Sequence, residues 1–160
     1  MNKKYGITGL ILIIILATVM ISGCIGDDTP TNDKFTNTVI FQGITFYLPD
    51  GYVSIDKSSD RTVIYEIYSD DGGNKNAIGL FYYPLVSKSQ VLSNLKSDSR
   101  YSNIDNSASY GGYSGYSAEF TGSIGEEAKI FVFEKGGKTF AITLSSGFNF
   151  GEYIPKIMGS

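Results

Sequence analysis

The amino-acid sequence predicts an α+β fold in which helices pack on an antiparallel β-sheet. From residue 38 onward, short β-branched and aromatic segments alternate with clusters of Gly, Pro, Asn and Asp, the pattern of strands joined by turns. Two segments, residues 88–98 and 150–158, have instead the apolar spacing of amphipathic helices. A domain of this length buries enough apolar surface to fold without a metal or a disulfide.

The predicted strands are bounded by residues that favour turns. Gly136-Gly137 predicts a two-residue hairpin loop, and Pro49-Asp50-Gly51 predicts a tight turn. Residues 57–60 are polar and are expected to be a loop. In the last strand Phe140, Ile142 and Leu144 alternate with smaller residues, which predicts one buried face. The strands are expected at residues 38–41, 44–48, 52–55, 62–68, 77–83, 104–110, 113–121, 126–135 and 138–145.

Each predicted helix has a recognisable boundary or breaker. Ser87 or Ser89 can cap the first helix, and its narrow apolar stripe predicts that it lies on the sheet with its polar face in water. The second helix contains Pro155, which breaks the pattern unless it lies in the first turn. The apolar stripe of the first helix consists of Val91, Leu92 and Leu95.

The N-terminus has the layout of a secretory leader. Lys3 and Lys4 form a short basic segment, and the following residues 7–21 are almost wholly apolar. The leader ends in Ile21-Ser22-Gly23-Cys24, which resembles the lipobox of bacterial and archaeal lipoproteins. This resemblance implies that residues 1–23 are a signal peptide and that the thiol of Cys24 carries a diacylglyceryl group. Two acyl chains would anchor the protein stably to the cell membrane.

An uncleaved transmembrane helix is the alternative interpretation of the leader. Residues 6–25 are long enough to span a bilayer, since about 20 residues suffice. In both cases Lys3 and Lys4 hold the N-terminus in the cytoplasm, so residues 26–160 are expected on the extracytoplasmic side.

A tether and a single domain are expected to follow the leader. Residues 24–37 are polar, acidic and without periodicity, which predicts a flexible spacer with a reach of about 20 Å. Residues 38–160 are expected to form the one folded domain.

The composition excludes several classes of function. The chain has 13 basic and 16 acidic side chains, and removal of the leader leaves 11 and 16, a net charge of −5. An acidic domain is a poor partner for phosphates, so nucleic-acid binding is not expected. With no His, the chain has neither a catalytic triad base nor an imidazole ligand for zinc, and its single Cys cannot form an internal disulfide. No cofactor is expected.

Two groups of acidic residues are candidate sites, and the sequence favours a surface role for both. Asp70, Asp71 and Asn74 offer oxygen ligands for Ca²⁺, but they lack the further ligands at fixed spacing that a calcium loop has, so a hairpin tip is favoured. Glu126 and Glu127 are adjacent on a predicted strand and therefore point to opposite faces, which prevents them from acting as a carboxylate pair.

A Tyr/Gly/Ser segment, residues 110–116, is the most suggestive stretch of the domain. Tyr offers rigid amphipathic contact area, so the segment suits recognition of a protein or a sugar. Cross-strand packing of Tyr110 on Tyr113 about the Gly-Gly turn is favoured over a binding patch.

No serine of the domain is expected to be a nucleophile. Ser114 is one residue out of register with the Gly-x-Ser-x-Gly motif. Ser93 and Lys96 match a Ser-x-x-Lys spacing, but they lie on the exposed side of the predicted first helix.

Three segments of the domain resemble PsbP-like domains. They are Gly43-Ile44-Thr45-Phe46-Tyr47-Leu48-Pro49-Asp50-Gly51-Tyr52, Gly115-Tyr116-Ser117-Ala118-Glu119-Phe120 and Gly137-Lys138-Thr139-Phe140-Ala141-Ile142-Thr143. Tyr52 stands where Trp is common in the family. The resemblance covers roughly residues 38–158 and implies a non-enzymatic α/β/α sandwich that serves as an accessory to membrane complexes. Family members bind through His and basic residues, which this acidic, His-free chain does not offer, so only the fold is transferred.

The expected function is that of a lipid-anchored, extracytoplasmic lipoprotein that acts as a non-catalytic binding or accessory module, with a membrane-protein complex as a possible partner. Two alternatives remain open at this point. One is an envelope hydrolase that uses a Ser–Lys pair or a bound metal, and the other is a purely structural surface protein.

Overall fold

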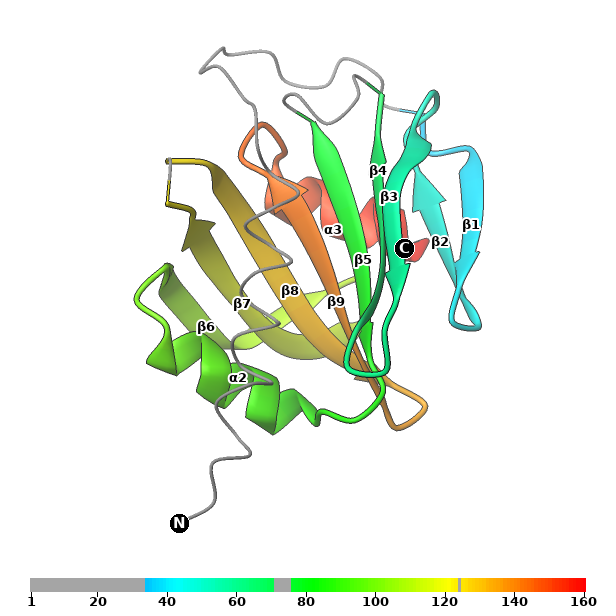
Figure 1. The fold of residues 1–160 in the computed structure, drawn as a ribbon. Helices are drawn as coiled ribbons and strands as arrows, with labels where there is room; N and C mark the ends of the chain where they lie inside the picture. Colours follow the sequence, from blue (N-terminus) through cyan, green and yellow to red (C-terminus); the bar gives the residue numbers. More distant parts are fainter. Residues whose placement is uncertain (1–33, 71–75, 124) are drawn as a thin grey trace.

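The structure is a computed structural model that describes residues 34–70, 76–123 and 125–160. It contains a seven-stranded antiparallel sheet in the order β3-β4-β5-β9-β8-β7-β6 and a separate β1–β2 hairpin (Figure 1). The α+β fold with an antiparallel sheet is confirmed. The strands are β1 (Asn37–Phe41), β2 (Ile44–Leu48), β3 (Val53–Ser59), β4 (Ile64–Ser69), β5 (Ala77–Tyr83), β6 (Tyr101–Tyr110), β7 (Tyr113–Thr121), β8 (Glu127–Lys135) and β9 (Lys138–Ser145), and the helices are α2 (Lys88–Ser97) and α3 (Phe150–Met158).

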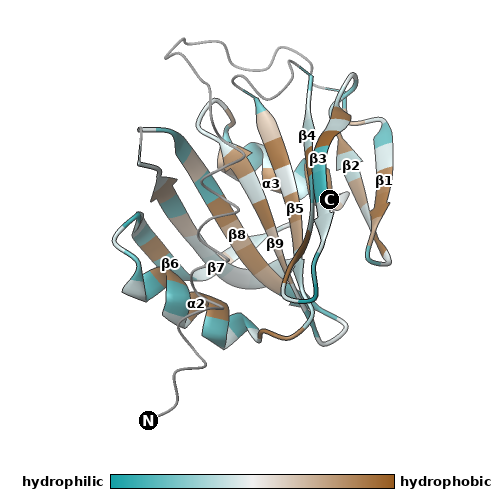
Figure 2. Cartoon of the chain, viewed as in Figure 1, coloured by the Kyte–Doolittle hydropathy of each residue, from teal (hydrophilic) through white to brown (hydrophobic). Residues whose placement is uncertain are grey.

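The two faces of the sheet are covered by different elements. On one face, α3 packs against β2 and β6, and the β1–β2 hairpin contributes Phe46 and Leu48 to the same core. On the other face, α2 packs against β6 and β8 through Val91 and Leu95. Figure 2 shows the hydrophobic residues concentrated on the central strands. The sheet is therefore the middle layer between two apolar cores.

The last strand of the chain, β9, lies at the centre of the sheet between β5 and β8. The prediction that it has one buried face is wrong, because every residue from Thr139 to Ser145 is buried. Ile142 and Leu144 face the core beneath α3, whereas Ala141 faces the core beneath α2. A central strand in a three-layer arrangement has no solvent face, so its smaller residues are buried as well.

The edge strand β3 is longer than predicted. Residues 57–59, expected to be part of a loop, continue the strand and pair with Ile64, Tyr65 and Glu66 of β4. All residues of β3 except the half-buried Ser58 are exposed. Backbone pairing with β4, rather than burial of side chains, defines this strand. Its polar sequence therefore does not indicate a strand.

Both helices lie where they were expected. Ser87 caps α2 with a reciprocal capping box, in which Gln90 N donates to the Ser87 hydroxyl and Ser87 N donates to the Gln90 side chain. Pro155 lies inside α3, beyond its first turn, and the helix nevertheless continues to Met158, so the expected break does not occur. The apolar residues of α3 hold the helix against the sheet in spite of the missing N–H.

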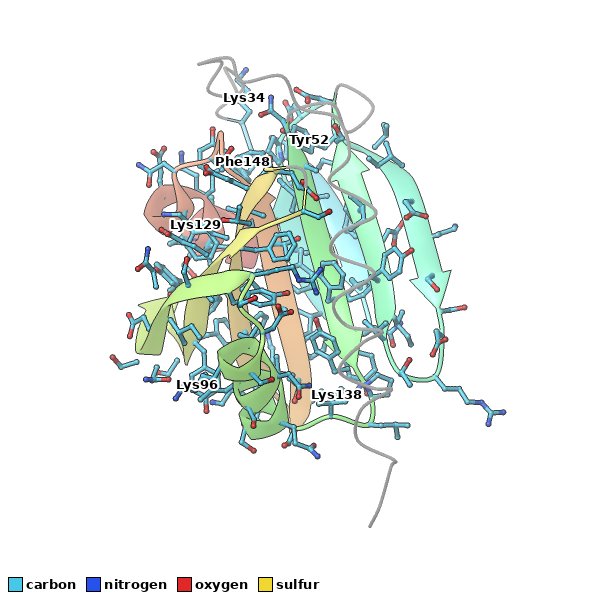
Figure 3. All side chains as sticks on the ribbon, turned by 60° about the vertical axis from the view of Figure 1, so that its left-hand side comes forward. Lys34, Tyr52, Lys96, Lys129, Lys138 and Phe148 are labelled. Carbon is cyan, nitrogen blue, oxygen red and sulfur yellow. The ribbon has the colours of Figure 1, made fainter. Side chains whose placement is uncertain are left out.

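Part of the segment expected to be a tether belongs to the folded domain. Asp50 N donates to Lys34 O at 2.8 Å, and the Phe35 ring packs edge-on against Tyr153 with centroids 5.3 Å apart. Residues 34–37 therefore pack on the domain, ahead of the expected boundary at residue 38. Figure 3 places Lys34 with Tyr52 and Phe148 at the end of the sheet opposite Lys138.

Two predictions lie outside the described residues. The leader with Cys24 falls within residues 1–33, and all of the proposed calcium ligands except Asp70 fall within residues 71–75. None of the helices in the described ranges has the length and apolar content needed to cross a membrane.

Candidate functional site

One corner of the sheet face beneath α3 is polar. Along β7, the residues that face this side include Gly115, Ser117 and Glu119, whereas Ala118 and Phe120 face the other core. On the neighbouring strand β8, the apolar Phe131 and Phe133 are followed toward the corner by Lys129. Lys129 is exposed and Ser117 and Glu119 are half-buried, so α3 leaves these polar residues uncovered.

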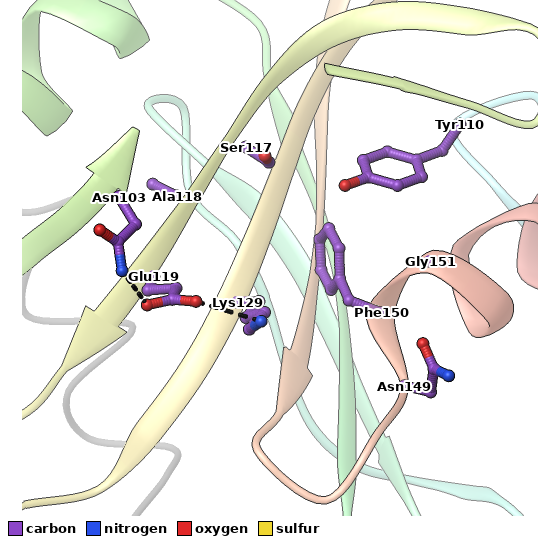
Figure 4. Close-up of a pocket in the computed structure, with 9 residues that line it drawn as sticks. All are labelled: Asn103, Tyr110, Ser117, Ala118, Glu119, Lys129, Asn149, Phe150 and Gly151. Carbon is purple, nitrogen blue, oxygen red and sulfur yellow. Dashed lines mark hydrogen bonds and ion pairs between the residues drawn. The ribbon is translucent and has the colours of Figure 1, made fainter. Parts of the chain in front are cut away.

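A cleft of about 220 Å³ lies over this corner. Its floor is formed by β6, β7 and β8, and its wall is formed by the start of α3 (Figure 4). The lining residues are Asn103, Tyr110, Ser117, Ala118, Glu119, Lys129, Asn149, Phe150 and Gly151.

A chain of polar contacts crosses the floor of the cleft. Glu119 and Lys129 are cross-strand partners, and Glu119 Oε1 lies 3.1 Å from Lys129 Nζ. Asn103 Nδ2 donates to Glu119 Oε2 at 2.5 Å. The hydrogen bond from Asn103, followed by that from Lys129, lowers the pKa of Glu119 below its usual value, so the carboxylate is charged at neutral pH.

Asn103 reaches Glu119 because the backbone of β6 is irregular. The pairing of β6 with β7 shifts register between Ser102 and Asp105, and Asn103 has a left-handed φ of 48°. Asn is one of the few residues other than Gly that adopts this conformation readily. A bulge of this kind re-aims a side chain, and here it directs the Asn103 amide toward Glu119.

The start of α3 forms the opposite wall. Asn149 is the N-cap residue, yet its side chain makes no capping hydrogen bond. The first N–H groups of a helix have no partner within the helix, and the helix dipole places partial positive charge there. Asn149, Phe150 and Gly151 thus bring polar groups to the cleft from the side facing Glu119 and Lys129 (Figure 4).

Two aromatic rings complete the wall. Tyr110 is half-buried and meets Phe150 edge-on, with ring centroids 5.4 Å apart, and it meets Phe131 in the same way at 5.0 Å. These contacts fix the Tyr110 ring at the boundary between the aromatic core and the polar cleft.

The structure brings one of the predicted tyrosines to this cleft. Tyr110 and Tyr113 are cross-strand partners about the Gly111-Gly112 turn, as the favoured interpretation expected. Tyr113 packs on Phe133 instead of lining the cleft. Tyr116 lies on the opposite face of the sheet, where the Lys88 ammonium is 5.4 Å from its ring centroid.

The predicted acidic pair and the Ser–Lys pair lie elsewhere. β8 begins at Glu127, so Glu126 precedes the strand instead of belonging to it, and Glu127 is exposed. Ser93 and Lys96 are both exposed on α2, and Figure 3 shows Lys96 well away from Lys129. Ser114 is exposed on β7, where it pairs with Ser109.

The acidic side chains of the described ranges do not gather into a group of three or more that could hold a metal ion. Within the cleft, the charged side chains are Glu119 and Lys129, and they are already paired with each other. The arrangement can therefore offer hydrogen bonds to a ligand without a net charge.

The residues of the cleft, Tyr110 apart, were not predicted as a site. They come from β6, β7, β8 and α3, and no local motif joins them. One signal was present in the sequence: the alternate residues Gly115, Ser117 and Glu119 give β7 a face without aliphatic side chains. In the structure Ser117 and Glu119 of this face are half-buried, whereas Gly115 is buried.

Comparisons with known proteins show distant similarities of fold. No protein-family model matches the chain, and no curated protein sequence matches it. Among solved structures, the cyanobacterial PsbP (CyanoP) of Synechocystis sp. PCC 6803 is similar over 76% of this chain and 85% of its own, with 15% identity and a TM-score of 0.46. LpqN of Mycobacterium tuberculosis, described as involved in cell envelope biogenesis, is similar over 62% of this chain and 67% of its own, with 15% identity and a TM-score of 0.26.

Proposed function

We propose that the protein is an extracytoplasmic lipoprotein, held at the cell membrane by a lipid on Cys24, whose domain is a non-catalytic binding or accessory module. The observation that carries the proposal is the end of the leader. An apolar run is followed by two small residues, Ser22 and Gly23, and then by the single Cys of the chain. The thiol is the side chain that can form a thioether with a lipid, and its position matches the cleavage point of the leader.

A binding role for the cleft is supported by the state of its charged groups. A general acid or base works best when its pKa is near the operating pH. The pKa of Glu119 is lowered, away from neutral pH, because Asn103 and Lys129 stabilise its charged form. These contacts hold Glu119 as a fixed hydrogen-bonding group.

The alternative of a Ser–Lys hydrolase has less support. Ser93 and Lys96 lie on α2, on the face of the sheet opposite the cleft, and both are exposed. A nucleophile of this type needs a desolvated lysine, because a solvated ammonium keeps its proton.

The experiment is an intact-mass measurement on protein isolated from membranes of the producing cell, beside a Cys24→Ser variant. The expected mass is that of residues 24–160 plus a diacylglyceryl group, and this species is absent from the variant. A mass equal to that of all 160 residues without lipid would contradict the proposal and favour a transmembrane anchor.

The accessory role is tested by chemical crosslinking in the same membranes. We expect one defined membrane protein to be captured by the natural chain and lost from the Cys24→Ser variant, which is no longer held at the membrane. Equal capture by both forms would contradict a role that depends on anchoring.

A further inference from the structure

We infer that the Glu119–Lys129 cleft binds a neutral, hydroxyl-rich ligand, the chemistry of a saccharide. This inference rests on the proposed binding role of the domain, and it names the class of ligand that the cleft accepts. Two properties of the lining residues lead to it: their charge balance and their mixture of donors and acceptors.

The charge balance disfavours ionic ligands of either sign. Glu119 Oε1 and Lys129 Nζ are 3.1 Å apart and neutralise each other. An anion would meet the Glu119 carboxylate, and a cation would meet the Lys129 ammonium together with the positive end of the α3 dipole. A neutral ligand meets neither penalty.

The lining offers both donors and acceptors at short range. The Lys129 ammonium has three donors and uses one on Glu119, while Asn149 makes no capping bond with its amide. Asn103 donates to Glu119 through Nδ2, and its Oδ1 is an acceptor. A hydroxyl both donates and accepts, so a ligand with several hydroxyls matches such a lining better than one with only donors or only acceptors.

The size and the polarity of the cleft suit a small ligand with several hydroxyls. The volume of about 220 Å³ is enough for several water molecules. Hydroxyls can replace the hydrogen bonds of such waters when they displace them. Phe150 is buried and Tyr110 is half-buried, so the accessible lining is mainly polar, with the Tyr110 ring at its edge.

The test is calorimetric titration of the full chain in a detergent without a sugar headgroup. The probes are three neutral trisaccharides, made of glucose, mannose and N-acetylglucosamine, each taken to 20 mM. Sodium acetate and inorganic phosphate serve as charged probes. We expect saturable binding of at least one trisaccharide and of neither anion.

The variant Lys129→Met removes the ammonium but keeps an unbranched side chain. We expect binding to weaken at least about tenfold, the size of effect typical for a lost hydrogen bond to a charged group. Lys88→Met is the matched control, because Lys88 is also paired with a carboxylate, Glu134 Oε2 at 3.8 Å, on the opposite face of the sheet. The control should bind the trisaccharide as tightly as the natural chain.

Three outcomes would overturn the inference: no trisaccharide binds, an anion binds in their place, or Lys129→Met and Lys88→Met weaken binding equally. These outcomes are distinct from failure of the proposed function. A lipidated protein that binds no saccharide leaves the anchor intact, and an unlipidated protein that binds one leaves the cleft intact.

Discussion

Asn103 and Glu119 lie on neighbouring strands and are joined by a 2.5 Å hydrogen bond that depends on a left-handed backbone at Asn103. The register shift of β6 places the Asn103 amide over the carboxylate, and Lys129 contacts the carboxylate from the other side. Both the left-handed backbone and the side-chain amide of Asn103 contribute to this contact, and a substitution can change one while it keeps the other.

The variant Asn103→Gly separates the effect of the backbone conformation from that of the side-chain amide. Gly adopts a positive φ without strain, so the backbone is kept and only the amide is lost. Because Asn103 is the largest cause of the lowered pKa of Glu119, we expect this pKa to rise toward its ordinary value. The carboxyl carbon of Glu119, followed by NMR during an acid titration, measures the change. An unchanged midpoint would show that Lys129 alone sets the pKa.

The same pKa shift sets the acid limit of the cleft. A carboxyl group with a lowered pKa in the folded state contributes stability that is present above its unfolded pKa and lost as the pH falls through the folded pKa. We expect trisaccharide affinity to be constant from pH 7 to about 5. It should decrease once the pH is below about 4, the ordinary pKa of a carboxyl group. Loss of affinity already at pH 6 would contradict this assignment.

Gly115→Ala and Gly151→Ala are expected to have opposite effects on stability. A Cβ at position 115 would lie 2.0 Å from the Val132 carbonyl oxygen, so β7 and β8 would have to separate. At position 151, in the first turn of α3, the nearest atom is 3.9 Å away. We expect a loss of about 3 kcal/mol for the first variant and a gain of about 0.5 kcal/mol for the second, measured by urea unfolding. A stable Gly115→Ala protein would contradict the close approach of the two strands.

Tyr83→Phe is expected to leave stability unchanged or to raise it by up to about 1 kcal/mol. Tyr83 is 2% exposed, and its hydroxyl has no hydrogen-bond partner within the described ranges. Removing a buried polar group that lacks a partner costs no hydrogen bond and relieves a desolvation penalty. Thermal unfolding of the two proteins measures the difference, and a clear loss would show that the hydroxyl is bonded.

Alkaline pH should destabilise the protein through the same residue. Burial raises the pKa of both Tyr83 and Tyr101 far above the usual value near 10. Above that value the unfolded chain releases phenolic protons that the folded chain retains, so the free energy of unfolding falls as the pH rises. Urea unfolding between pH 8 and 11 measures the slope, and Tyr83→Phe should make it shallower. Identical slopes would contradict retention of the Tyr83 proton.

The success of sequence prediction differs between elements for physical reasons. The bounds of β9 and the capped start of α2 were predictable, since glycines, serine and apolar periodicity mark them locally. The length of β3 was not, because its last residues are polar and are held by backbone pairing alone. The burial of both faces of β9 depends on its central place in the sheet, which its own residues do not encode.

The residues of the cleft were hard to predict for the same reason, because tertiary structure brings them together. Glu119 and Lys129 are ten positions apart and meet only through the register of β7 with β8, while Asn149 comes from a helix at the end of the chain. The left-handed backbone of Asn103 belongs to a bulge that no turn motif in the sequence indicates. Only Tyr110, singled out for its Tyr/Gly/Ser setting, was predicted, and its main contacts are with core aromatic rings.

The place of β9 in the sheet also constrains how the chain matures. Strands β3 to β5 and strands β6 to β8 are two separate meanders, and within the described sheet β9 is the strand that joins them. Until Lys138–Ser145 is available for pairing, β5 and β8 each present an unpaired edge. The two meanders can therefore join into one sheet only after β9 has been synthesised, which makes completion of the sheet a late step.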